Sequence, residues 1–206
     1  QTLPEGYLQI GVFDITRNMR LVLLLNFIGL GLAVLFGGLF TGLLFALRPD
    51  EAAAGLSVEI NNMGQIGLLV LGLLLLSAAM VVLHEAAHGL FFWFFTRHRP
   101  IFAFKGAYAY AAMPGWFFPR CHYLVVGFAP LVLLSLAGVA LMLFAPPAWF
   151  LGLIVFLVSN AAGAVGDLWV MGWLLLQKPG VLAQDQGDAV RLYAPAAPPA
   201  IISRSR

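Results

Sequence analysis

The sequence predicts an all-α membrane protein that crosses the lipid bilayer with four helices and has both termini in the cytoplasm. Its composition supports this, because 62% of the residues are hydrophobic and only 10% are charged, whereas a soluble domain carries about 25% charged residues. Four long apolar stretches and a one-sided distribution of basic residues predict the number and direction of the helices. The net charge of +2, without a basic patch interleaved with aromatics, argues against nucleic acid as a partner. Lipid is therefore the predicted surrounding of most of the chain.

Each apolar stretch is long enough to form a membrane-spanning helix. The stretches cover residues 21–47, 64–96, 123–145 and 149–177. A helix needs roughly 20 residues to cross about 30 Å of hydrocarbon. Only Pro146, Pro147 and Ala148 join the last two stretches, which predicts a tight hairpin between antiparallel spans. Pro130 lies inside the third stretch and predicts a kink there.

Basic residues in the connecting segments predict the orientation. Segments 1–20, 97–122 and 178–206 carry two, four and four Lys or Arg residues, whereas the other connections carry Arg48 alone. Cytoplasmic loops of membrane proteins are enriched in Lys and Arg. Both termini and segment 97–122 are therefore predicted to lie on the cytoplasmic side of the cell membrane.

Two of these segments show short patterns of their own. Residues 101–104 and 107–112 alternate on either side of a glycine, which predicts a short β-hairpin-like segment between the second and third spans. The sequence Asp-Gln-Gly-Asp at 185–188 predicts a turn before a short strand. The predicted domain organisation is one membrane domain over residues 1–193 and a Pro- and Ala-rich tail over residues 194–206.

Ionisable side chains inside the spans are the candidate functional groups, because an acid at the bilayer centre costs about 2.5–3.5 kcal/mol on an insertion scale. The four spans contain only His84, Glu85, His88 and Asp167. The first three form an HExxH motif. Two histidines four residues apart share one helix face and can bind one ion, while Glu85 can reach a water on that ion. A plain structural alternative, two interfacial histidines with a snorkelling glutamate, leaves Asp167 unexplained.

Asp167 is the candidate third ligand of a zinc ion held by His84 and His88. A catalytic zinc site has three protein ligands and an open position for water. Counted from the outer ends of their spans, His84 and Asp167 lie about 30 Å and 27 Å along their helices, at nearly the same depth toward the cytoplasm. Asn160 lies two turns before Asp167 on the same face. It is predicted either to help hold a substrate or to form an interhelical hydrogen bond.

The motifs that contain these residues resemble those of the putative zincin peptidases, a family of small bacterial membrane proteins. The similar segments are residues 3–7 (LPEGY), 84–89 (HEAAHG), 105–110 (KGAYAY), 127–130 (GFAP), 160–169 (NAAGAVGDLW) and 185–188 (DQGD). The resemblance implies that His84, His88 and Asp167 bind zinc. It also implies that Glu85 is the catalytic acid and base.

More distantly, the chain is similar to the site-2 intramembrane metalloproteases. It departs from them at Gly163, where that family usually has a proline, and at Leu168, where it usually has a glycine. The predicted function is a Zn²⁺-dependent metalloendopeptidase of the HExxH type that hydrolyses membrane-associated protein substrates near the cytoplasmic face. The main alternative is a non-catalytic membrane subunit of a larger complex, with a structural or vestigial metal site. Pigment or haem binding and proton-coupled transport are further alternatives.

Overall fold

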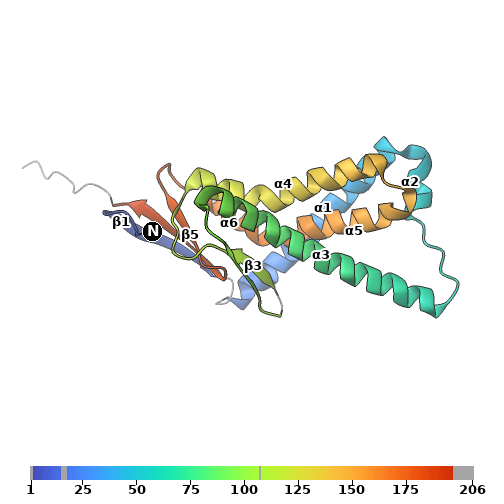
Figure 1. The fold of residues 1–206 in the computed structure, drawn as a ribbon, viewed down its shortest axis with the longest axis horizontal. Coiled ribbons are helices and arrows are strands. Elements are labelled where there is room, and N and C mark those ends of the chain that lie inside the picture. The colour runs from blue at the N-terminus through green and yellow to red at the C-terminus, as the bar shows by residue number, and fades with distance from the viewer. Residues whose placement is uncertain (1, 15–17, 107, 197–206) are drawn as a thin grey trace, which may run out of the picture.

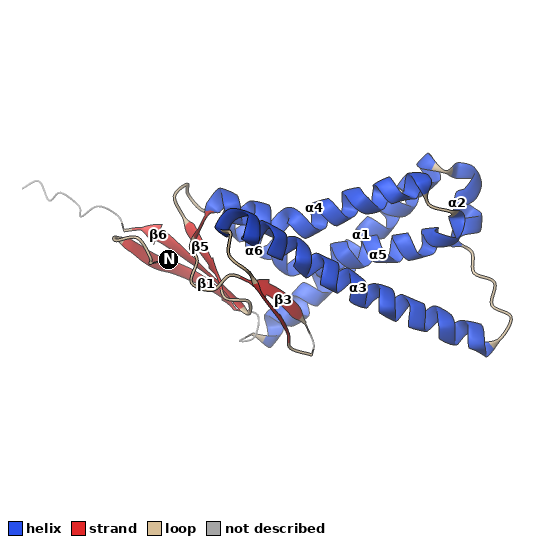
Figure 2. Cartoon of the chain, viewed as in Figure 1, coloured by secondary structure: helices blue, strands red, loops and turns tan. Residues whose placement is uncertain are grey.

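The computed structural model describes residues 2–14, 18–106 and 108–196, and Figures 1 and 2 show their arrangement. The helices are α1 (Met19–Leu47), α2 (Pro49–Leu56), α3 (Met63–Thr96), α4 (Arg120–Phe144), the short 3-10 helix η2 (Pro147–Trp149), α5 (Phe150–Gly163) and α6 (Val165–Leu175). The strands are β1 (Tyr7–Asp14), β2 (Ile101–Phe104), β3 (Ala109–Ala112), β4 (Phe118–Pro119), β5 (Leu182–Asp185) and β6 (Ala189–Pro195). The helices form an elongated bundle, and the strands gather at one end of it (Figure 2).

The long helices correspond to the predicted spans. Helices α1, α3 and α4 are each long and apolar enough to cross a membrane, and α5 and α6 together give a fourth candidate. This last pair is bent by 44°, so the single helix predicted over residues 149–177 is replaced by two. The break falls at Ala164, directly after Gly163, and glycine is a poor helix former. The N–H of Ala164 still bonds the carbonyl of Asn160 at 3.0 Å, so helical hydrogen bonding continues up to the bend.

The strands correct the predicted all-α class to a mostly helical fold with a small antiparallel sheet. Four of them are ordered β1-β6-β5-β4. Strand β1 pairs with β6, with Val12 opposite Arg191. The turn at 185–188 and the strand after it agree with the sequence prediction, but β1, β4 and β5 were not predicted. The partner of β1 lies at the other end of the chain, and no local pattern reveals so distant a pairing.

The predicted hairpin between the second and third spans is present. Strands β2 and β3 pair antiparallel, with Ile101 opposite Ala112 and Phe104 opposite Ala109. Gly106 lies in the connection with a φ of 74°, a left-handed conformation that glycine adopts without steric strain. The hairpin packs against the C-terminal half of α3, where Ala111 bonds Glu85 and Phe102 lies beside Gly89.

Two buried clusters hold the elements together. The first joins α3, α4 and α6 to β5 and β6 around Phe92, Met171 and Leu192. The second lies at the opposite end of the bundle and joins α1, α2, α4 and α5 around Leu44 and Phe150. The first cluster fixes the C-terminal half of α3 and helix α6 relative to the sheet, and these are the helices that carry the candidate site.

Substitution of Gly55 by Ala should destabilise the second cluster. A Cβ atom at Gly55 would lie 2.6 Å from the carbonyl oxygen of Pro147 and 2.5 Å from the ring of Phe150. Overpacking of this kind costs about 1–3 kcal/mol. Gly42→Ala is the matched control, because a Cβ there meets nothing within 4 Å. Thermal denaturation in detergent should show a lower midpoint for Gly55→Ala alone, and equal midpoints for the two variants would contradict this packing.

Candidate metal centre

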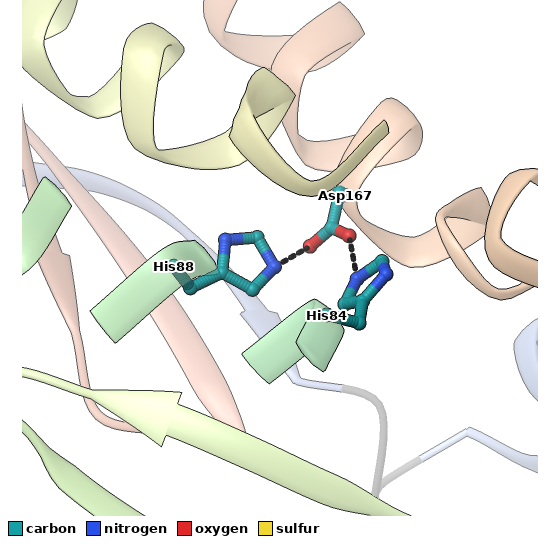
Figure 3. A group of neighbouring side chains, drawn as sticks. All are labelled: His84, His88 and Asp167. Carbon is teal, nitrogen blue, oxygen red and sulfur yellow. Dashed lines mark hydrogen bonds and ion pairs between the residues drawn. The ribbon is translucent and has the colours of Figure 1, made fainter. Parts of the chain in front are cut away.

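Helices α3 and α6 bring His84, His88 and Asp167 together. The histidines lie one turn apart on α3 and Asp167 lies in the first turn of α6, with all three side chains pointing toward one another (Figure 3). Nε2 of His84 is 3.0 Å from Oδ2 of Asp167, and Nε2 of His88 is 3.3 Å from Oδ1. The possible ligand atoms all lie within 4.8 Å of one another. The proximity expected from their depths along the chain is therefore present in the structure.

The second ring nitrogen of each histidine indicates how the ring is protonated. Nδ1 of His88 is 2.9 Å from the carbonyl oxygen of Val126, and a carbonyl can only accept, so this Nδ1 carries the hydrogen. The amide nitrogen of Asn160 donates to the carbonyl of Pro130 at 3.3 Å. Its Oδ1 therefore faces Nδ1 of His84 at 3.0 Å, and this Nδ1 also carries a hydrogen. Both histidines are left with Nε2 directed at the carboxylate.

This arrangement calls for a cation at the centre. In the neutral imidazoles, each Nε2 presents a lone pair to an acceptor-only carboxylate. Such pairs repel at 3.0–3.3 Å unless a proton or a metal ion lies between them. Zinc binds imidazole nitrogen and carboxylate oxygen at about 2.0–2.2 Å, and tetrahedral ligands at that range lie about 3.3 Å apart. The three side chains could therefore hold a zinc ion and leave its fourth position open.

Glu85 lines the same cavity, which has a volume of about 210 Å³. Its Oε2 accepts a hydrogen bond of 2.6 Å from the backbone N–H of Ala111 in β3. The carboxylate is thus held between α3 and β3, at the wall of the cavity that also contains the three possible ligands. A water molecule occupies about 30 Å³ in the liquid, so the cavity has room for several waters beside the side chains.

The hairpin and the β5–β6 turn meet at this cavity. Lys105 forms an ion pair with Asp188, and the Tyr108 hydroxyl donates to the same carboxylate at 2.7 Å. The hydrogen bond from Lys105, and after it the one from Tyr108, hold the pKa of Asp188 below its ordinary value. Two segments singled out by sequence resemblance, 105–110 and 185–188, are therefore joined directly. Sequence reasoning treated them as separate surface features.

Asp185 is a cavity residue that sequence reasoning interpreted only as part of a turn. Its carboxylate accepts a hydrogen bond of 2.6 Å from the Tyr123 hydroxyl and one of 2.8 Å from the N–H of Gly187. Burial raises the pKa of Asp185 to about 6. One signal in the sequence could have identified Asp185. The segment 185–188 contains two aspartates, and a turn requires only one.

Comparison with known protein families gives a match over the candidate site. A family model with the description "Putative zincin peptidase" matches residues 77–182, just over half of the chain. The match starts within α3 and ends at the first residue of β5, so it includes the HExxH motif, Asn160 and Asp167. No curated protein and no solved structure matches the chain. The similarity to site-2 proteases stays a prediction.

Asp185→Asn should alter stability in a way that depends on pH. Because the folded-state pKa of about 6 lies above the ordinary 3.8, folding favours the protonated carboxyl. That stabilisation is complete below about pH 4 and is lost as the pH rises to about 6. A shift of about two pKa units corresponds to roughly 3 kcal/mol. Relative to the variant, the metal-free parent protein should therefore lose up to about 3 kcal/mol between pH 4 and pH 8.

Chemical denaturation of both proteins at the two pH values, with a chelator present, measures this difference. Asp50→Asn is the control, because Asp50 is exposed on α2 at the opposite end of the bundle. If the difference in free energy of unfolding between the parent and Asp185→Asn is the same at both pH values, the raised pKa of Asp185 is contradicted.

Proposed function

This chain belongs to the family described as "Putative zincin peptidase", and from that premise we propose that it is a zinc metalloendopeptidase embedded in the cell membrane. The observation that carries the proposal is the convergence of His84, His88 and Asp167 beside Glu85 in one cavity. Three protein ligands with an open position are typical of catalytic zinc, whereas structural zinc has four. A carboxylate beside the open position is what peptide hydrolysis additionally requires.

The side chains take distinct roles in this proposal. Zinc held by the two histidines and Asp167 would supply a water of lowered pKa and polarise the peptide carbonyl. Glu85 accepts a proton from the attacking water and returns it to the leaving amine. The N–H of Ala111 holds the Glu85 carboxylate at the cavity wall. Asn160 orients His84 by accepting its Nδ1 hydrogen.

We place this centre near the cytoplasmic face of the membrane. The strands lie at one end of the bundle (Figure 1). Basic residues contact them there: Lys105 pairs with Asp188 of the β5–β6 turn, and the N–H of Arg120 bonds the carbonyl of Val181. At the other end, Arg48 donates to the carbonyls of Met142 and Leu143. Positively charged segments remain on the cytoplasmic side during insertion, which supports a cytoplasmic location for both termini.

We further propose that a substrate binds as an extended peptide beside β3. Within the described residues this strand is paired with β2 on one edge, and on its other edge the N–H of Ala111 points to Glu85. A strand edge next to the cavity that pairs with no other strand can add an extended peptide by backbone hydrogen bonds, and here the peptide would lie beside the Glu85 carboxylate. A helical membrane segment would have to unwind before it could bind in this way, because its carbonyls are already hydrogen-bonded within the helix.

One observation favours the alternative of a subunit in a larger membrane complex. The outer half of α3 is little covered by the rest of the chain, and the first buried residue of this helix is Met80. This half borders an apolar groove of about 1240 Å³ between α3, α4 and α5. A partner helix or lipid could cover it, and either would be compatible with an active centre at the other end of α3.

Glu85→Gln should abolish proteolysis while zinc binding persists. The amide keeps the size of the side chain but cannot take a proton from water, and loss of general acid–base catalysis reduces rates about 10²–10⁴-fold. Zinc content of the purified protein by mass spectrometry should be about one ion per chain. Activity is measured as new protein N-termini in membranes of cells that produce each form.

Glu59→Gln is the matched control, because Glu59 is an exposed glutamate in the α2–α3 connection. The control should match the parent in both measurements. New N-termini that persist with Glu85→Gln would contradict the role of this carboxylate. A parent that binds zinc, enters a complex and generates no new N-termini would favour the non-catalytic subunit.

A further inference from the structure

The backbone of α4 contacts the candidate metal centre at an interior proline. In an α-helix the carbonyl of residue 126 accepts the N–H of residue 130. Residue 130 is Pro130, which has no N–H, although α4 continues from Arg120 to Phe144. The carbonyl of Val126 is therefore left without its helical partner. Both residues are buried, so this acceptor needs another donor.

His88 provides that donor. Its Nδ1 lies 2.9 Å from the carbonyl oxygen of Val126, in a buried contact between α3 and α4. The bond fixes the hydrogen on Nδ1 and leaves the lone pair of Nε2 for the cation site beside Asp167. A proline at this position therefore frees the backbone acceptor that orients one of the possible ligands.

The carbonyl of Pro130 itself serves the other histidine. It accepts from the amide nitrogen of Asn160 at 3.3 Å, and this fixes which end of the amide faces His84. Asn160 is completely buried, so its two hydrogen bonds determine its orientation. One proline-containing turn of α4 therefore supports both imidazoles, directly for His88 and through Asn160 for His84.

We propose that Pro130 is a positioning residue of the metal centre, and that it acts by keeping the Val126 carbonyl available to Nδ1 of His88. This inference rests on the proposed zinc site. It goes beyond the family match and beyond the HExxH motif, because the residue has no contact with the metal position and lies on a helix that carries no ligand. If Pro130 served only to bend α4, its replacement would leave the affinity for zinc unchanged.

Substitution of Pro130 by Ala or by Gly tests the proposal, because both restore an N–H that competes for the Val126 carbonyl. Loss of a hydrogen bond to a metal-ligating histidine typically weakens metal binding 10–100-fold. Both variants should raise the dissociation constant for zinc by that factor. The measurement is competition with a chromophoric chelator, made on the purified full chain in detergent. Leu133→Ala, one turn further along α4 and half-exposed, should match the parent.

The two variants separate positioning from helix stability. Alanine favours a helix and glycine disfavours it, so thermal midpoints of the metal-free proteins should differ while zinc binding is weakened in both. Either variant with the dissociation constant of the parent overturns the proposal, as does an equal loss in Leu133→Ala. A parent that binds no zinc overturns the proposed function together with this inference, whereas an unchanged Pro130 variant beside a zinc-binding parent overturns the inference alone.

Discussion

The structure depends on the contact between one carboxylate on α6 and two imidazoles on α3. A charged carboxylate that is buried away from water is stable only with partners, because burial removes the hydrogen bonds that water would supply. Asp167 has both of its oxygens directed at the Nε2 atoms of His84 and His88. The three groups impose a fixed distance between α3 and α6, and the elements around them supply the further hydrogen bonds that these groups require.

The helix geometry follows from this requirement. The bend at Ala164 sets Asp167 in the first turn of α6, where the free N–H groups of a helix start favour negative charge. Helix α4 approaches α6 closely, since a Cβ at Gly127 would lie 2.3 Å from the sulfur of Met171. Helix α4 also packs against α3, where the Val126 carbonyl lies 2.9 Å from Nδ1 of His88. Small residues and a proline therefore serve the polar centre as well as packing.

Sequence reasoning identified the long apolar helices and the group of polar residues because both depend on local composition. Few charges, four apolar runs and the isolated residues His84, Glu85, His88 and Asp167 are visible in the sequence, and a count of residues along two helices placed them at one depth. The sheet was not predictable in the same way, because β1 pairs with a strand at the other end of the chain. The acceptor for His88 was also hidden, since a backbone carbonyl carries no signature in the sequence.

The cavity is lined partly by residues inside the range that the family model matches and partly by residues outside it. The possible ligands and Glu85 lie within residues 77–182, and so does β3, whose backbone holds the Glu85 carboxylate. Other walls come from outside that range, including Phe13 of β1 and Val190 of β6. Because these side chains line the same cavity as Glu85, their size limits what the cavity can hold. If the chain hydrolyses peptides as proposed, substitution there would alter which peptides fit while leaving Glu85 and the possible ligands in place. The two ends of the chain therefore help to shape a cavity whose candidate functional groups lie between them.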